Sequence, residues 1–152
     1  MIKHGPAKIR DSVLDAFLQA WREEALVVNQ WFSMQAIRPA SEVVEEVEQL
    51  SQHEAFDWRN PNKVRALIGA FASANLVGFH RADGAGYRLL ADAIIKLQAD
   101  NPQIAARLCT PLTRYRRYAT GQQKMRGELE RIAQVENLSR DVFEVVERAL
   151  AG

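Results

Sequence analysis

Apolar residues recur along almost the whole chain with the spacing of one face of an α-helix. One such stripe consists of Val13, Ala16, Phe17, Ala20 and Trp21, which lie at i, i+3, i+4, i+7 and i+8. The same spacing returns in the stretches 64–72, 87–95 and 142–150, and with one position missing in 125–133. Each stretch therefore predicts an amphipathic helix. No segment alternates apolar and polar residues between turn signals, so we expect no β-strands.

Helix-start signals divide this pattern into about eight helices. Asn60-Pro61 and Asn101-Pro102 each place a capping side chain before a proline at the first helical position. Ser41 and Ser139 are further candidate caps, and Thr120-Gly121-Gln122-Gln123 fits a capping box. The expected helices span residues 10–22, 25–37, 41–52, 61–74, 85–99, 102–117, 121–135 and 139–151.

The order of these helices predicts a repeat architecture. Asn60-Pro61 followed by Leu67 returns 41 positions later as Asn101-Pro102 followed by Leu108, close to the ~40–47 residues of two-helix repeats. We therefore expect an all-α fold whose antiparallel helices stack as a HEAT/armadillo-like right-handed superhelix, in preference to a closed bundle. Pro111 should kink or split the sixth helix, because it lacks an N–H and clashes with the preceding turn.

Length and charge narrow the class of protein. The chain has 152 residues, which suits a single domain over 1–152, and its 20 basic and 19 acidic residues leave a net charge of +1. This balance gives no global field for nucleic acid or an anionic membrane. The longest uncharged apolar run, residues 66–79, is too short to cross a bilayer. We expect a soluble, cytoplasmic protein.

The residues that could carry chemistry do not assemble into a recognisable catalytic set. The stretch from His53 to Asp57 begins like a zinc-protease helix, but Asp57 stands where that motif needs its second histidine. Cys109 is the single cysteine and suits a small buried hydrophobe. We therefore expect no metal site and no catalytic residue in this chain.

Charge is nevertheless distributed unevenly along the sequence. Residues 107–131 carry a local charge of +5, and residues 42–54 carry a local charge of −5. The run 114–118, Arg-Tyr-Arg-Arg-Tyr, interleaves cations and aromatic rings as some nucleic-acid-binding surfaces do. Opposite charges on one solenoid more often stack repeats or dock a partner domain. A stand-alone helical-repeat scaffold that binds a protein or nucleic acid through the basic 107–131 face remains the alternative function.

Longer blocks of sequence resemble a known family. They are LVVNQWFSMQA at 26–36, FDWRNPNKVRALIGAF at 56–71, FHRADGAGY at 79–87, NPQIAARL at 101–108 and ENLS at 136–139. Together they resemble the C-terminal helical domain of bacterial aminopeptidase N, the alanyl aminopeptidase of the gluzincin metallopeptidases. The resemblance runs from about Arg10 to Ala151, which is nearly the whole chain.

The resemblance implies a role within a larger enzyme. In that family this domain is a helical superhelix that packs over a thermolysin-like catalytic domain and encloses the chamber holding the zinc. The zinc-binding HExxH helix and the GAMEN exopeptidase motif lie in domains that this sequence lacks. The chain is thus expected to be a non-catalytic part of a four-domain, membrane-alanyl-type zinc aminopeptidase. Its expected partners are the catalytic domain of the same polypeptide and peptide substrates, with no nucleic acid and no membrane.

Two positions match residues that line the family's inner cavity, Gln103 and Arg107. The resemblance implies that they lie near substrate beyond the scissile bond. Their i, i+4 spacing puts them on one helix face, and the forked donors of Arg107 suit a carboxylate or carbonyl oxygen. The alternative for this pair is two polar residues on a solvated face.

Overall fold

The computed structural model describes residues 7–21 and 24–152, and every regular element within this part is helical. The elements are α1 (Ala7–Trp21), α2 (Ala25–Ala36), α3 (Val43–Leu50), α4 (Pro61–Val64), the π-helix η2 (Arg65–Gly69), α5 (Ala70–Ala74), α6 (Leu76–Phe79), α7 (Ala85–Leu97), α8 (Pro102–Leu108), α9 (Thr110–Thr113), the 3-10 helix η3 (Tyr115–Arg117), α10 (Gln122–Ala133) and α11 (Arg140–Ala151). The prediction of an all-α fold is confirmed.

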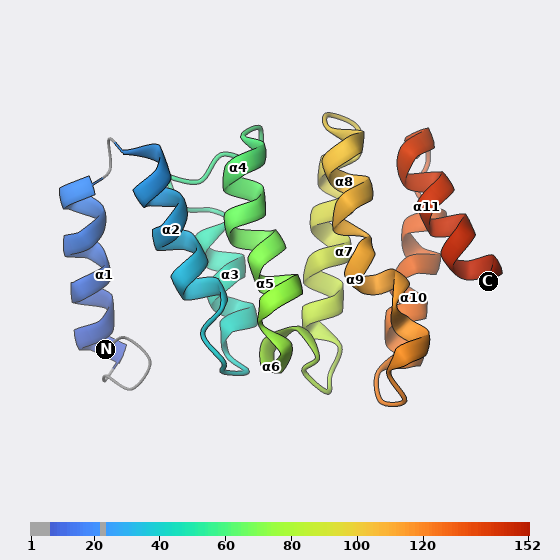
Figure 1. Cartoon of the computed structure of the whole chain (residues 1–152), viewed down its shortest axis with the longest axis horizontal. Coiled ribbons are helices and arrows are strands. Elements are labelled where there is room, and N and C mark those ends of the chain that lie inside the picture. Colours follow the sequence, from blue (N-terminus) through green and yellow to red (C-terminus); the bar gives the residue numbers. More distant parts are fainter. Residues whose placement is uncertain (1–6, 22–23) are drawn as a thin grey trace.

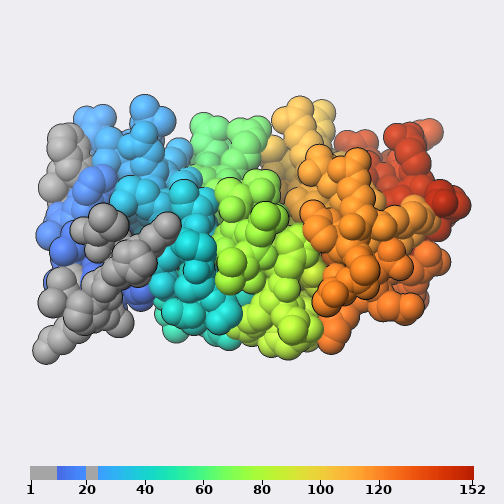
Figure 2. Space-filling view, turned by 60° about the horizontal axis from the view of Figure 1, so that its bottom comes forward, coloured from blue at the N-terminus to red at the C-terminus, as the bar shows by residue number. Residues whose placement is uncertain are grey.

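The helices stand side by side in two layers (Figure 1). The first layer contains α2, the continuous α4–η2–α5 unit, α8 with α9, and α11, whereas the second contains α3, α7 and α10. Within the second layer α7 packs on α3 and α10, and it also contacts α8 across the layers. Figure 2 shows the segments following one another in chain order along the long axis. This arrangement agrees with stacked helix pairs, and the right-handed superhelix stays a prediction.

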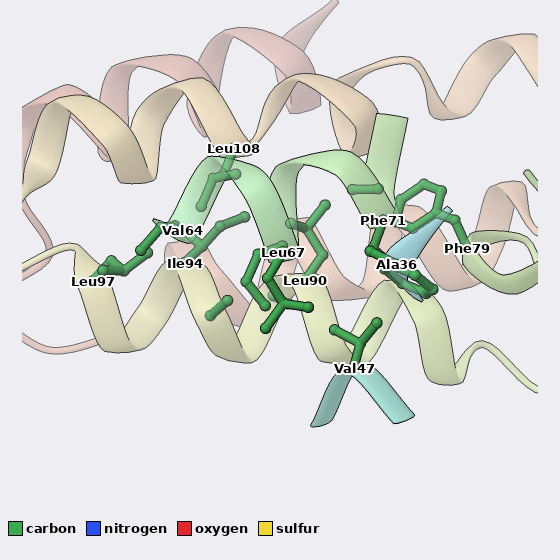
Figure 3. Close-up of a cluster of buried hydrophobic side chains, with 14 of the residues drawn as sticks. Ala36, Val47, Val64, Leu67, Phe71, Phe79, Leu90, Ile94, Leu97 and Leu108 are labelled. Carbon is green, nitrogen blue, oxygen red and sulfur yellow. The ribbon is translucent and has the colours of Figure 1, made fainter. Parts of the chain in front are cut away.

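The core runs between the layers and has α7 at its centre. Leu90, Ile94 and Leu97 of α7 are buried and meet side chains from several other helices. Figure 3 shows this convergence, with apolar side chains of α2, α3, α4, η2, α5, α6 and α8 around α7. The amphipathic stripe predicted for residues 87–95 is therefore the side of α7 that holds the layers together.

Three of the predicted helix caps are confirmed. The side chain of Asn60 accepts hydrogen bonds from the amides of Asn62 and Lys63, and Asn101 accepts one from the amide of Ile104. Ser139 caps α11 by accepting from the amide of Val142. In each case the side chain satisfies a backbone N–H that the first helical turn leaves without a partner.

Two other predicted caps are wrong. Glu42, in a helical conformation, precedes α3 in place of Ser41 and makes no side-chain capping bond. Gly121 caps α10 in place of Thr120, with φ of 87°. A Cβ at Gly121 would lie 2.5 Å from the hydroxyl oxygen of Tyr87, so close packing and a left-handed backbone both select glycine there.

Two helix predictions need correction in their interiors. The helix expected over 61–74 contains the π-helical turn η2, and the short helix α6 was expected to be a loop. The helix expected over 102–117 is divided into α8, α9 and η3, and its first part ends at Leu108. This division confirms the split predicted from Pro111. Cys109 lies at this break with its thiol buried against the carbonyl oxygen of Ala105, and burial raises its pKa to about 12.

The carboxamide of Asn75 fixes α6 to the end of α2. Its Nδ2 donates to the carbonyl oxygens of Ala36 and Arg38, each at 2.8 Å, and its Oδ1 accepts from the amide of Gly78 at 2.9 Å. Asn75 is 1% exposed, and these three bonds satisfy polar groups that water cannot reach. One side chain thus caps α6 and positions it beside the first layer.

Two helical glycines should respond oppositely to alanine. A Cβ at Gly86 would lie 2.3 Å from the carbonyl oxygen of Phe79, whereas a Cβ at Gly127 would meet only open space. We expect Gly86→Ala to lower the free energy of unfolding by about 1–3 kcal/mol. Gly127→Ala should raise it by about 0.5–1 kcal/mol through helix propensity. Urea titrations of the two variants and the parent chain measure both shifts, and equal effects would contradict this packing.

Candidate substrate-contacting groove

Gln103 and Arg107 project from the exposed face of α8. The cap provided by Asn101 fixes the start of this helix. Ile104 and Leu108 are buried, whereas Gln103 and Arg107 are exposed and lie one turn apart on the helix. No carboxylate of the described chain lies within salt-bridge distance of the Arg107 guanidinium. The guanidinium is therefore free to bind an anionic or carbonyl group from outside.

Arg107 also lines a groove between the α5–α6 and α8–α9 segments. This groove has a volume of about 330 Å³. Its lining residues are Gly69, Ala72, Ser73, Leu76, Phe79, His80, Arg107, Leu108, Thr110, Pro111, Arg114 and Tyr118. They include two arginines and no acidic residue, so the groove is complementary to a negative group on a partly apolar ligand. Gln103 lies one helical turn before the groove and is not part of its wall.

An aromatic cluster supports the end of the groove that is nearer to α6. The rings of His80 and Tyr118 lie 4.4 Å apart between centroids, and Phe79 packs edge-on against His80 at 5.0 Å. Nδ1 of His80 lies 2.7 Å from the hydroxyl oxygen of Tyr87. These contacts hold His80 and Tyr118, which come from separate loops, in one wall.

Burial keeps this wall uncharged near neutral pH. Desolvation lowers the pKa of His80, because its imidazolium form would lose water without gaining an acidic partner. Desolvation also raises the pKa of Tyr87, and the neighbouring Tyr118 adds to that shift. The fixed positive charges of the groove therefore come from Arg107 and Arg114.

Arg65 of η2 is a further exposed cation, one turn before Gly69, and it is not a lining residue of the groove. Its Cβ lies 3.8 Å from the position that a Cβ would take on Gly69, a lining residue of the groove. Its guanidinium is exposed and donates to Oδ1 of Asn62 at 3.0 Å. The π turn of η2 inserts an extra residue into the helix and rotates its face, which a 3.6-residue pattern cannot register.

The basic run 107–131 does not form one face. Arg107 and Arg114 line the groove, whereas Arg116 stacks over the ring of Tyr115 and donates to the carbonyl oxygen of Ala149. Arg131 lies on α10 and pairs with Asp92 of α7 at 2.8 Å. The cations are thus divided among three places, which weakens the case for a continuous nucleic-acid surface.

The described residues provide no metal site. No three histidine, cysteine, aspartate or glutamate side chains come together within 7–21 and 24–152 in a way that could hold an ion. His53 instead accepts a hydrogen bond on Nδ1 from the amide of Ala55 at 3.0 Å, within a turn. The zinc that the resemblance implies therefore has no set of ligands among these described residues. Over the same residues no helix combines the length and apolar character that a membrane span requires.

Comparison with known proteins identifies the family. A family model described as a domain of unknown function (DUF3458_C) with ARM repeats matches residues 1–151. The chain is 47% identical to aminopeptidase N of Haemophilus influenzae and 45% identical to aminopeptidase N of Escherichia coli, over 93% of its length in both cases. The chain belongs to the aminopeptidase N family. It spans 16% of the length of each of these relatives and corresponds to their C-terminal regions.

A solved structure agrees with this assignment. The crystal structure of Legionella pneumophila aminopeptidase A in complex with aspartic acid superposes on this chain with a TM-score of 0.89 at 36% identity. The match covers 95% of this chain and 17% of the Legionella chain. The aminopeptidase N resemblance read from the sequence blocks is therefore confirmed, and so is the helical-repeat class.

The lowered pKa of His80 predicts a specific pH dependence of stability. Above its ordinary pKa of 6.5, His80 is neutral in both the folded and the unfolded chain. Below that pH the unfolded chain takes up a proton more readily, so the free energy of unfolding falls until the folded pKa is reached. His80→Gln, which can still bond to Tyr87, should lose less stability than the parent chain between pH 7.5 and pH 5.5. Urea denaturation at both pH values tests this, and identical losses would contradict it.

Proposed function

We propose that residues 1–152 form a single, non-catalytic C-terminal domain that closes the active-site chamber of a zinc aminopeptidase and helps to select its peptide substrates. The family membership supports this proposal, as does the small share of each relative that the chain spans. The catalytic residues and the zinc belong to the catalytic domain of the same polypeptide, which we expect to be a cytoplasmic enzyme. That enzyme removes N-terminal residues from peptides.

The distribution of exposed apolar side chains carries the proposal. Among residues 10–19 and 24–152, whose burial the structure describes, the large apolar residues that remain well exposed are Val13, Leu26, Met34, Ile37, Leu76, Val77 and Phe143. They lie on α1, α2, α6, α11 or the turn after α2, and none lies on α3, α7 or α10. Exposed large apolar groups are typical of a surface that another domain covers. We infer that the first layer and α6 face the catalytic domain. The groove between the α5–α6 and α8–α9 segments, with Leu76 on its wall, stays open toward the chamber.

The second layer has the character of a solvated surface. Arg81 bridges Glu45 of α3 and Asp83 at 2.8 and 2.9 Å. Arg131 of α10 joins Asp92 of α7 in a similar way. Exposed ion pairs of this kind contribute little stability and are compatible with water on all sides. The first layer also carries an exposed ion pair, Arg140 with Glu144 of α11 at 3.0 Å. The two layers therefore differ in their exposed apolar side chains, and it is this difference that supports docking through the first layer.

Gln103 and Arg107 lie on the first layer, where the proposal requires them. Arg107 has five N–H donors and a permanent charge, so it suits a carboxylate or carbonyl just beyond the scissile bond. Gln103 lies in the first turn of α8 and adds a neutral amide one turn away. We propose that this pair lines the chamber and contacts the second residue of the substrate.

Removal of the Arg107 charge should affect peptides more than single-residue amides. In the full-length enzyme, Arg107→Ala should lower kcat/KM for dipeptides with a free carboxylate by roughly tenfold, the low end for a charged hydrogen bond that is open to solvent. Hydrolysis of alanine p-nitroanilide should change little, because this substrate extends little beyond the scissile bond. Arg117→Ala, an exposed arginine outside the groove, is the matched control. Equal losses on both substrates would refute the assignment.

Docking through the first layer predicts that one substitution changes the stability of the full-length enzyme but not that of the isolated chain. Met34 is exposed on α2 in this chain, so Met34→Asp should leave the isolated chain nearly as stable as before. In the full-length enzyme the same change should lower the melting temperature of this region, because a buried methionine contributes roughly 1.5–3 kcal/mol. Gln49→Asp, an exposed change on the second layer, should be neutral in both contexts. Differential scanning calorimetry can compare the four proteins, and a silent Met34 variant in the full-length enzyme would place the docking surface elsewhere.

A further inference from the structure

Arg114 is the feature of the groove that the proposed function does not use. It lies on the groove wall beyond α9, is exposed, and has no carboxylate of the described chain within salt-bridge distance. Arg116, two residues later, differs because its guanidinium stacks on the ring of Tyr115 and donates to the carbonyl oxygen of Ala149. Arg114 thus presents an uncompensated guanidinium to the same hollow that Arg107 lines.

The spacing of the two arginines matches a short extended peptide. Arg114 follows Arg107 by seven residues, and a helical rise of about 1.5 Å per residue places it roughly 10 Å further along the broken α8–α9 segment. An extended chain covers this distance with about three residues, at roughly 3.3–3.6 Å each. If Arg107 contacts the second residue of a substrate, Arg114 lies near the fifth.

The uncharged lining residues of the groove suit peptide side chains. Leu76 is exposed at the groove, and Tyr118 lies half-buried against His80. His80 is uncharged near neutral pH because burial lowers its pKa. The groove therefore offers an apolar wall between two fixed cations and contains no acidic lining residue that would repel a carboxylate.

We propose that this groove is an extended substrate subsite in which Arg114 binds the C-terminal carboxylate of peptides about five residues long. The proposal rests on the proposed function, because it needs the groove to open into the chamber. It adds a length preference that Gln103 and Arg107 alone do not create. Arg114 acts as a specificity-determining residue and takes no part in bond cleavage.

The test is a length series in the full-length enzyme. The probes are alanine peptides of two to seven residues, each with a free carboxylate and as its C-terminal amide. Arg114→Gln removes the charge but keeps hydrogen-bonding capacity. It should lower kcat/KM roughly tenfold for the free-carboxylate pentapeptide and leave the dipeptide and all amides within about twofold. Arg117→Gln serves as the matched control, and melting temperatures check that each variant folds.

Two further measurements complete the test. One asks whether a side-chain carboxylate can replace the terminal carboxylate, and the other uses a charge reversal at Arg114 in case the neutral Gln variant has too small an effect. Amidated pentapeptides with glutamate at the fifth position show whether a side-chain carboxylate substitutes for the terminal one, and we expect only a weak response. Arg114→Glu should reduce cleavage of the free-carboxylate pentapeptide more than Arg114→Gln does and should leave its amide unchanged.

Each outcome decides the proposal. A loss confined to free carboxylates near five residues supports it, whereas a loss at all lengths, an equal loss for amides, or no loss overturns it. If Arg107→Ala affects no substrate while Arg114→Gln keeps its length dependence, the assignment of Gln103 and Arg107 fails and the groove stands. If both variants are silent, the groove does not meet the substrate.

Discussion

The buried carboxamide of Asn75 is the interaction on which the first layer and the groove depend. It holds two carbonyl groups at the end of α2 and the first turn of α6 at once, so α6 cannot move relative to α2 without leaving polar groups unsatisfied. Leu76 and Phe79, which line the groove, belong to this short helix. A four-residue helix has little stability of its own, so its position comes from this network and from packing.

The contact between α6 and α7 adds a second constraint on the same region. Gly86 brings the start of α7 so close to the backbone of Phe79 that no side chain could occupy the gap. Because α7 also packs on α3, α8 and α10, the position of α6 is linked to the centre of the molecule. The wall of the groove is therefore fixed by buried contacts to α2 and α7, although it is built from loops and short helices.

The sequence predicted those parts of the fold that depend on local signals. Asn60, Asn101 and Ser139 were recognisable as caps because their hydrogen bonds join residues two or three positions apart. Thr120 failed as a cap because α10 begins from Gly121, which has a left-handed backbone. Tyr87, far away in the sequence, leaves no room for a side chain at that position. The helix α6 was missed for a similar reason, since Asn75 draws two of its three partners from the end of α2. Gln103 and Arg107 were singled out by the resemblance of the 101–108 block to the family, and helix spacing added only that they share a face. The association of Arg114 with His80 and Tyr118 required the tertiary structure.

The buried thiol at the break between α8 and α9 has a practical consequence. Cys109 is the only cysteine of the sequence, it is fully buried, and its raised pKa keeps it protonated in the folded chain. A protonated, inaccessible thiol reacts slowly with electrophiles, because the thiolate is the reactive form. Alkylation of this chain therefore reports on opening of the α8–α9 segment. The native sequence thus contains a single-site chemical probe of local unfolding beside the groove, and no engineered label is needed to follow it.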